Sequence, residues 1–351
     1  MAKGIAAAVG ASMAEHGVPG AAVAVARAGV PYYSHGFGIA NLETASPVTP
    51  TTVFRYGSIT KQFAAAAAIK LASQGKLDLG APVFEYLPVF KQLKPFSTLE
   101  LMHQTAGLHS DESEELPSQA FKARDQIELA AEIASQAKPF DFDPGTAWLY
   151  SNANFIVLGA VIEQVTKVPL AQAMEALVYG PLNLSSMAID TPDQIVAGRA
   201  SGYSQTGDPG RPFANAAYAD PSQAGGAGAM RGTVMDLVRW PAALLSGKLF
   251  DQTHVSLMTA PGKLRDGRLS GANRFSPDDA HYGDTQYACG LLVTGPSEAT
   301  PSILHYGSFY GFCAMVQTFT RKNVTIAALC NSDLGPGVPF RGIRKAVIAG
   351  W

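Results

Sequence analysis

The chain has 351 residues, of which 47% are hydrophobic and 15% charged, and its formal net charge at pH 7 is −2. A chain of this length can bury a large core and predicts two domains, or one large domain with an insertion. The small net charge and the lack of a basic cluster with interleaved aromatic residues argue against a nucleic-acid partner. No run of 18 or more apolar residues occurs, so we expect no membrane span.

The beginning of the chain, MAKGIAAAVG, lacks the long apolar core and cleavage site of a signal peptide. It fits either a periplasmic or secreted protein whose leader has been removed, or a cytoplasmic protein. The cysteines do not decide between these compartments. Cys289, Cys313 and Cys330 each lie in a run that predicts a core strand, and three thiols cannot all pair, so we expect buried free thiols.

The first part of the chain predicts a helix followed by strands. Residues 4–17 have the pattern of an amphipathic helix, and residues 21–42 predict two strands joined at Ala28–Gly29. Residues 52–56 predict a short strand, and after Gly57 comes a long run of helix formers. That run is apolar almost all round, which indicates a helix buried in a large protein.

From about residue 76 to 200 the signals are helical and rich in loops. Residues 125–138 predict an amphipathic helix, and residues 158–165 carry apolar side chains at the i, i+3, i+4, i+7 spacing of another. The stretches 191–224 and 259–282 predict long loops. Loops of that length are usually functional, so we expect substrate identity to depend on these two, although their sequences do not specify it.

The last part of the chain predicts strands at 287–293, 305–319 and 324–332, followed by a short helix from about residue 339. Strands at both chain ends with helices between them predict an α+β or α/β fold. Its antiparallel sheet is built from both chain ends and flanked by helices, with a mainly helical domain inserted.

The domain boundaries follow from this arrangement. We expect residues 1–60 and 225–351 to form the sheet domain and residues 61–224 to form the helical domain. The active site is expected in the cleft between the two.

Ser58 stands at the start of the predicted buried helix, where backbone N–H groups lack partners. Lys61 follows three residues later, so its side chain lies on the same face of a helix as Ser58. A serine hydroxyl is a poor nucleophile until a base takes its proton, and a lysine in an apolar, desolvated setting can become such a base. The pair therefore predicts an activated nucleophile.

The same spacing occurs in Ser73/Lys76 and Ser135/Lys138. Both of these pairs stand at predicted helix ends, where a capping serine and a solvated lysine are expected. The spacing alone therefore does not identify a site.

Two other segments add polar side chains. Tyr150-Ser-Asn152 lies on a predicted turn before a helix, and His305-Tyr-Gly307 lies on a late predicted strand. Each also has a purely structural explanation, because a loop tyrosine is often a half-buried packing residue and a strand histidine is often a hydrogen-bonded core group.

Taken in order, these segments resemble the serine β-lactamase and penicillin-binding-protein superfamily, nearest its class C, DD-carboxypeptidase and D-aminopeptidase branch. The similarity extends over most of the chain. Further segments that carry it are His103-Gln-Thr-Ala-Gly-Leu108, Asp143-Pro-Gly-Thr146, Phe155, Ala224-Gly-Gly-Ala-Gly228, Asp236 and Trp240.

The resemblance implies a role for each matched residue. Ser58 would be the acylated nucleophile, and Lys61 would hold or relay its proton. Tyr150 would shuttle protons from Ser58 and then from the hydrolytic water. Asn152 would bind the side-chain amide of the substrate, and the backbone N–H groups of Ser58 and Ser308 would form the oxyanion hole.

The third motif departs from the lactamase pattern. Lactamases carry Lys-Thr-Gly there, whereas this chain has His305 and Gly307. The His-x-Gly form is similar to that of DD-carboxypeptidases and D-amino-acid amidases, and a histidine is mostly neutral near pH 7. We therefore do not expect an efficient β-lactamase. His281-Tyr-Gly283 has the same form, but it lies in an irregular segment, so we favour His305.

The leading hypothesis is a cofactor-free serine hydrolase that forms an acyl-enzyme and cleaves amide bonds in small-molecule or short-peptide substrates that contain D-amino acids. A carboxylesterase with a β-lactamase-like fold is the alternative. A non-catalytic domain that binds cell-wall fragments is a third reading. The chain has no Gly-x-Ser-x-Gly elbow, no His-Glu-x-x-His or other metal-ligand spacing, and no phosphate loop.

Overall fold

The computed structural model describes residues 2–110, 120–294, 300–333 and 340–349. Their centre is an eight-stranded sheet in the order β3-β2-β1-β13-β12-β11-β10-β9, in which neighbouring strands pair antiparallel. The strands are β1 (Gly20–Arg27), β2 (Val30–Asn41), β3 (Ser46–Pro47), β9 (Gln286–Tyr287), β10 (Leu292–Val293), β11 (Ser302–Phe309), β12 (Phe312–Phe319) and β13 (Val324–Cys330). The first strand of the chain thus lies beside the last, so the sheet joins both chain ends.

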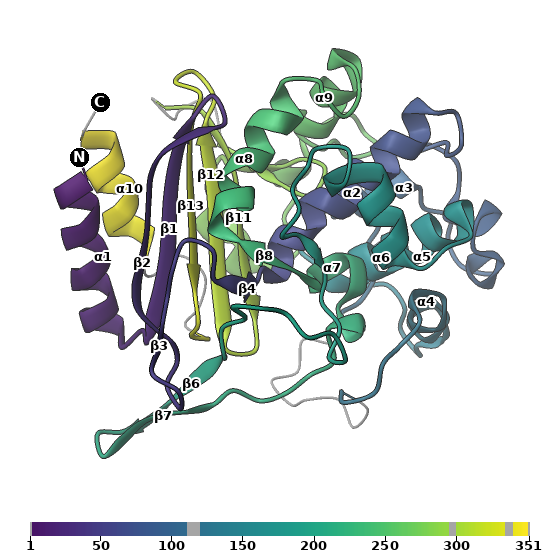
Figure 1. The fold of residues 1–351 in the computed structure, drawn as a ribbon. Helices are drawn as coiled ribbons and strands as arrows, with labels where there is room; N and C mark the ends of the chain where they lie inside the picture. Colours follow the sequence, from purple (N-terminus) through teal and green to yellow (C-terminus); the bar gives the residue numbers. More distant parts are fainter. Residues whose placement is uncertain (1, 111–119, 295–299, 334–339, 350–351) are drawn as a thin grey trace.

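Helices cover both faces of this sheet, and β1 shows why. Its Val23 and Val25 pack on the face covered by α1 (Ala2–His16) and α10 (Phe340–Ala349), where they share one apolar cluster. The intervening alanines of β1 point to the other face and join the larger core. There α8 (Val234–Leu245) contacts β1, β2 and β13. The small alanine side chains let the helix lie close to the sheet. Figure 1 shows α1 and α10 side by side on the outer face and the remaining helices on the other.

The mainly helical region lies on the α8 side of the sheet (Figure 1). It is built around α2 (Thr60–Ser73), in which Ala64–Ala68 are fully buried and let neighbouring helices approach closely. At its sheet side, Phe63 stacks on Trp240, and the Trp240 indole donates a 2.8 Å hydrogen bond to Gln62. The other helices are α3 (Thr98–Met102), α4 (Gln126–Ser135), α5 (Asn152–Thr166), α6 (Leu170–Met174), α7 (Gly225–Gly228) and α9 (Gln252–Thr259).

These features confirm the predicted fold class: an antiparallel sheet from both chain ends, flanked by helices, with mainly helical structure between them. The exact domain boundaries stay a prediction. One detail differs from the single sheet expected. The strand before Ser58, β4 (Val53–Arg55), pairs with β8 (Met230–Thr233) in a separate three-stranded sheet with β5 (Ala188–Ile189).

The prediction that residues 191–224 form only loop is wrong in part. β6 (Tyr203–Asp208) and β7 (Arg211–Asn215) pair as a hairpin that projects from the body of the molecule (Figure 1). Most of its side chains are polar or exposed, so the alternation that marks a half-buried strand is missing from the sequence. The stretch 259–282 contains only short 3₁₀ turns, as the loop prediction implies.

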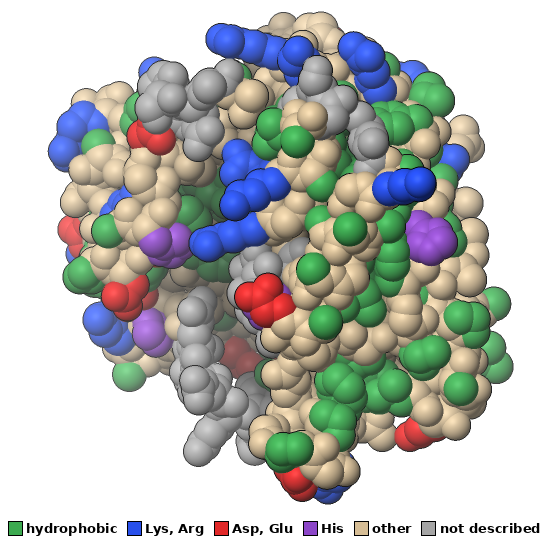
Figure 2. Space-filling view, turned by 90° about the vertical axis from the view of Figure 1, so that its left-hand side faces the viewer, with side chains coloured by type: hydrophobic (Ala, Val, Ile, Leu, Met, Phe, Trp, Pro, Cys, Tyr) green, Lys and Arg blue, Asp and Glu red, His purple; other side chains and the backbone are tan. Residues whose placement is uncertain are grey.

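The face that carries α1 and α10 has a group of Lys and Arg side chains near its middle and hydrophobic side chains at several places around them (Figure 2). Within the described residues, no single helix is long and apolar enough to cross a membrane. Only the bent pair of α5 with residues 170–179 reaches the needed length and composition, and most residues of α5 are buried in the core.

Candidate active site

Ser58 lies in a 3₁₀ turn, Gly57–Ile59, that leads from β4 into α2. This turn is pressed against β11. A Cβ on Gly57, whose φ is +53°, would lie 2.4 Å from the carbonyl oxygen of Ser308. A Cβ on Gly307 would lie 1.9 Å from the carbonyl oxygen of Tyr56. Two glycines therefore let the serine turn and β11 approach to backbone contact.

The Lys61 side chain is fully buried beneath Ser58. Its Nζ donates to Ser58 Oγ at 3.0 Å, to Asn152 Oδ1 at 2.7 Å and to the Ala227 carbonyl at 2.9 Å. These acceptors come from the Gly57–Ile59 turn, from α5 and from α7. Three parts of the chain therefore fix the amine at the serine hydroxyl, as the Ser-x-x-Lys spacing predicts.

Tyr150 lies just before α5 and is half-buried. Lys61 Nζ lies 4.7 Å from the centre of its ring. The same ring lies 6.2 Å, centre to centre, from the His305 imidazole. The structure thus brings Ser58, Lys61, Tyr150, Asn152 and His305 together.

His305 is held in a single neutral form. Its Nδ1 lies at the Tyr306 carbonyl oxygen, which can only accept, so Nδ1 carries the proton. Its Nε2 is then the acceptor of a 3.1 Å hydrogen bond from the Tyr287 hydroxyl. Burial, and to a smaller extent the nearby Lys61 charge, lower the pKa of His305 to about 3. A neutral imidazole therefore occupies the position that the resemblance matches to the lysine of lactamases.

Tyr287 and Gln104 belong to this site but were not identified from the sequence. Tyr287 is buried, and burial raises the pKa of its hydroxyl well above the usual value, as does Tyr150. Gln104 is fully buried, and its Oε1 accepts from the Ser151 N–H at 3.1 Å and from Asn154 Nδ2. Gln104 thus supports the turn that carries Tyr150. It lies in the His103–Leu108 segment that carried the resemblance, whereas no sequence signal distinguishes Tyr287.

Ser308 presents its backbone N–H to the serine turn. The Ser302 carbonyl oxygen accepts a 3.0 Å hydrogen bond from Thr294 N, so Ser302 faces the β10 side. The N–H and C=O of one strand residue point to the same side, and every second residue repeats that direction. Ser308 belongs to this set, but β10 reaches only as far as the Leu292–Leu304 pair. The Ser308 N–H therefore faces the Gly57–Ile59 turn rather than a strand.

The other candidates lie outside this cluster. Ser73 and Ser135 are exposed, each is the last residue of its helix, and each hydroxyl donates to a backbone carbonyl. His281 lies in an exposed 3₁₀ turn beside the Asp278 carbonyl. No group of three or more His, Cys, Asp or Glu residues in the described part of the chain could hold a metal ion.

A cysteine and histidine pair lies near the site but is inert. His103 Nε2 lies 3.4 Å from Cys289 Sγ, and both residues are buried. Burial lowers the pKa of His103 to about 4 and raises the pKa of Cys289 to about 12. Both groups are therefore neutral at pH 7, and the thiol is not a nucleophile. Cys313 and Cys330 are also buried free thiols, as predicted.

Comparison with known proteins agrees with this geometry. The family model described as Beta-lactamase matches residues 5–349. A putative D-alanyl-D-alanine carboxypeptidase of Salmonella heidelberg is 25% identical over 350 residues, which cover 86% of this chain and 76% of the relative. Esterase EstB of Burkholderia gladioli is 33% identical over 192 residues, 49% of this chain and 47% of the relative.

Among solved structures, a D-stereospecific amidohydrolase from Streptomyces sp. superimposes with a TM-score of 0.81 at 25% identity. The match covers 100% of this chain and 99% of the other.

Proposed function

The chain belongs to the Beta-lactamase family, and we propose that it is a serine hydrolase that cleaves amide bonds in D-amino-acid peptides or amides through an acyl-enzyme. The observation that carries this proposal is the buried Lys61 amine, 3.0 Å from the Ser58 hydroxyl. The similarity to a putative D-alanyl-D-alanine carboxypeptidase over 86% of this chain, and to a D-stereospecific amidohydrolase over its full length, supports the substrate class.

In the acylation step, Ser58 Oγ attacks the substrate carbonyl while its proton passes to Tyr150 in its deprotonated form, and the charged Lys61 amine holds Oγ in place. The backbone N–H groups of Ser58 and Ser308 stabilise the oxyanion of the tetrahedral intermediate. Each such donor is typically worth about 10²–10³ in rate. The intermediate collapses when the leaving amine takes a proton from Tyr150.

In the deacylation step, Tyr150 accepts a proton from water, and the resulting hydroxide attacks the acyl carbon. The bond to Ser58 Oγ then breaks, and the serine recovers its proton. Asn152 has two tasks in this scheme. Its Oδ1 holds Lys61, and its Nδ2 donates to the amide carbonyl of the bound substrate.

The third motif limits the substrate range. Because His305 is neutral, it supplies no fixed positive charge for the carboxylate of a β-lactam antibiotic. The backbone of Gly307 and Ser308 still binds the acyl group of the substrate. We therefore expect slow hydrolysis of β-lactams beside faster hydrolysis of D-amino-acid amides.

The test is a substrate panel of D-alanine p-nitroanilide, a D-Ala-D-Ala peptide, nitrocefin and p-nitrophenyl acetate, run on wild type and Ser58→Ala. Ser58→Ala should lose all activity and labelling by a fluorophosphonate. Ser73→Ala is the matched control, because Ser73 has the same spacing to a lysine but is exposed. Equal labelling of the Ser58→Ala protein would reject the assignment.

Esterase activity is the second candidate, because the highest identity among the curated relatives reported above is to esterase EstB. The two activities separate on the same panel. Turnover of p-nitrophenyl acetate without turnover of D-amides would replace the amidase by an esterase. Slow acylation without turnover of any substrate would indicate a binding domain instead.

A further inference from the structure

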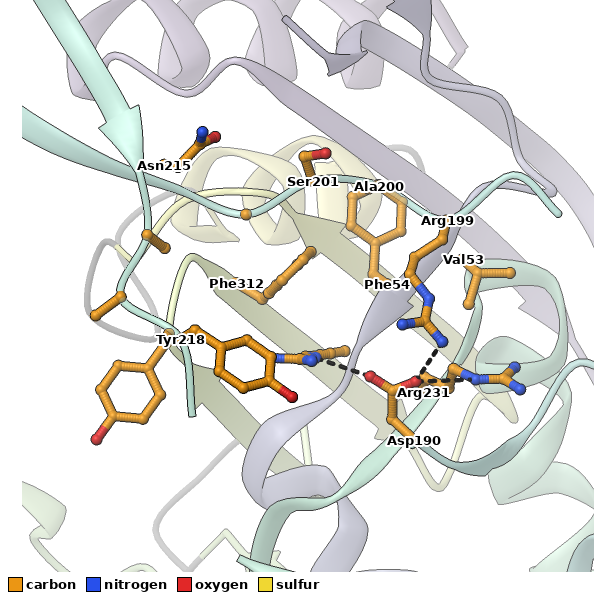
Figure 3. Close-up of a pocket in the computed structure, with 15 residues that line it drawn as sticks. Val53, Phe54, Asp190, Arg199, Ala200, Ser201, Asn215, Tyr218, Arg231 and Phe312 are labelled. Carbon is orange, nitrogen blue, oxygen red and sulfur yellow. Dashed lines mark hydrogen bonds and ion pairs between the residues drawn. The ribbon is translucent and has the colours of Figure 1, made fainter. Parts of the chain in front are cut away.

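A cavity of about 210 Å³ lies beside β4 and the turn between β11 and β12. None of the proposed catalytic side chains lines it. Figure 3 shows Asp190 in this cavity, joined by dashed lines to the arginines around it, with Tyr218 at some distance across the space. The cavity is close to the active site along the chain, because Arg55 precedes Ser58 by three residues.

Three guanidinium groups surround the single buried carboxylate of Asp190. Arg55 Nε lies 2.9 Å from Oδ2, Arg199 Nη2 lies 2.8 Å from Oδ1, and Arg231 Nε lies 3.2 Å from Oδ1. Among the described residues, Asp190 is the only carboxylate within ion-pair distance of these arginines. Glu43 lies at the rim, where Asn215 Nδ2 donates to it at 3.2 Å, but it pairs with none of them. Two of the three positive charges therefore have no carboxylate of their own within ion-pair distance.

The other partners of these arginines are neutral. Arg199 Nη2 also approaches the carbonyls of Thr191 and Gln194, and Arg231 Nη2 donates to the Gln194 side chain at 2.6 Å. The Nε of Arg199 is buried and has no hydrogen-bond partner. Burial lowers the pKa of Arg231, the Asp190 charge partly offsets this, and the Arg199 charge adds to it. A bound anion would compensate these like charges and the unpaired donor.

The walls suit a small molecule with an apolar part. The Arg55 guanidinium lies over the Phe309 ring at 5.0 Å and over the Phe312 ring at 5.9 Å, which holds its planar face in place. At the mouth, the exposed Tyr218 ring stacks on the exposed Phe121 ring at 6.2 Å. Exposed aromatic rings at a concave site commonly mark a ligand-binding surface.

We propose that the cavity formed by Arg55, Arg199 and Arg231 around Asp190 binds a small molecule through an oxyanion group, a carboxylate or a phosphate. Guanidinium groups match such anions because their planar forks donate two parallel hydrogen bonds. Asp190 keeps the three side chains in place and removes only one of their three charges. The site does not depend on which amide or ester is hydrolysed at Ser58.

Calorimetric titration of the Ser58→Ala protein with inorganic phosphate and with succinate tests the proposal without any need for activity. Binding of at least one anion is expected, and Arg199→Gln should weaken it by about tenfold or more, because it removes a charged hydrogen-bond donor. Arg211→Gln, which removes the same charge from the exposed β7 strand, should leave binding unchanged. Absence of binding, or equal weakening by Arg211→Gln, would overturn the proposal.

A second variant guards against a folding defect in Arg199→Gln. Tyr218→Glu places a negative charge on the exposed rim, where the packing tolerates it, and should also abolish anion binding. Binding that survives unchanged in a folded Tyr218→Glu protein would contradict the site as placed here.

The source of the anion is decided on the active enzyme. The KM of a D-amino-acid dipeptide with a free carboxylate is compared with the KM of its C-terminal amide, in wild type and in Arg199→Gln. A rise in KM confined to the free carboxylate identifies the anion as part of the substrate. Unchanged KM values together with loss of calorimetric binding identify a separate ligand. Both results require the anion site. Failure of the proposed hydrolase function would appear only in the comparison of wild type with Ser58→Ala.

Discussion

The hydroxyl of Tyr287 donates to His305 Nε2 across 3.1 Å, and both side chains are buried. His305 lies on β11, the strand that also presents Gly307 and the Ser308 N–H to Ser58, the proposed nucleophile. A tyrosine that no motif identifies therefore holds the strand that would bind the oxyanion. This arrangement makes Tyr287 a positioning residue of the site.

We expect Tyr287→Phe to lower kcat more than it raises KM. The change leaves His305 Nε2 as a buried acceptor without a donor, which costs about 1–3 kcal/mol. It also loosens β11 while the substrate contacts of α5 remain. Steady-state kinetics with D-alanine p-nitroanilide and urea unfolding measure both effects. Tyr33→Phe, on β2 away from the site, is the control, and an equal loss of kcat there would count against the positioning role.

Lys61→Met should remove acylation while the fold persists. Methionine has a similar volume, but it cannot hold Ser58 Oγ by a hydrogen bond or relay its proton, and general acid–base catalysis is worth about 10²–10⁴ in rate. The acylation rate, measured by fluorophosphonate labelling, should fall by that factor. The matched control is Lys76→Met, because Lys76 has the same spacing to Ser73 but is exposed. Retention of the wild-type rate in Lys61→Met would exclude Lys61 from the acylation step.

The stability of the folded protein should fall as the pH is lowered from about 6.5 toward 4. The pKa of His305 is about 3 and that of His103 about 4 in the folded protein, both below the ordinary value of 6.5. Between these values the unfolded chain binds more protons, so stability decreases as pH falls. Each histidine contributes a slope of about 1.4 kcal/mol per pH unit in that window.

Urea unfolding between pH 7 and pH 4.5 measures this slope. His305→Asn should reduce it by the contribution of one proton, about 1.4 kcal/mol per pH unit. His281→Asn, at an exposed position, should leave the slope as in wild type. A slope that His305→Asn does not change would show that His305 is protonated in the folded protein at these pH values.

How far the sequence predicts this structure depends on how local each signal is. The sheet core was predictable because β1, β12 and β13 are mostly apolar and buried over almost all their length. The Ser58–Lys61 contact was predictable because three residues on a helical turn bring two side chains to one face. Both signals lie within one segment of the chain.

Contacts between separate segments were not predictable in the same way. The Tyr287–His305 hydrogen bond joins β9 to β11 across the intervening β10, so it depends on strand order. The Asp190 cluster draws its arginines from three separate segments, at residues 55, 199 and 231. Neither arrangement has a fixed spacing in the sequence. The resemblance to a known family supplied the order of the catalytic motifs but neither of these contacts.

The close approach of Gly57 to Ser308 gives the last prediction. Gly57 has a φ of +53° and Gly75 a φ of +68°, so alanine is strained at both positions. The two differ in their surroundings, because a Cβ at Gly57 would lie 2.4 Å from the Ser308 carbonyl oxygen, whereas a Cβ at Gly75 would meet nothing within 4 Å.

Gly75→Ala should therefore cost about 1–2 kcal/mol of stability from backbone strain and leave kcat unchanged. Gly57→Ala should cost more and also push the serine turn away from β11, and a misplacement of about 1 Å at a catalytic group can lower the rate about 10²-fold. Unfolding curves and kcat values of the two variants, measured side by side, separate strain from displacement. If kcat falls equally in both, the contact between Gly57 and Ser308 is not what positions the nucleophile.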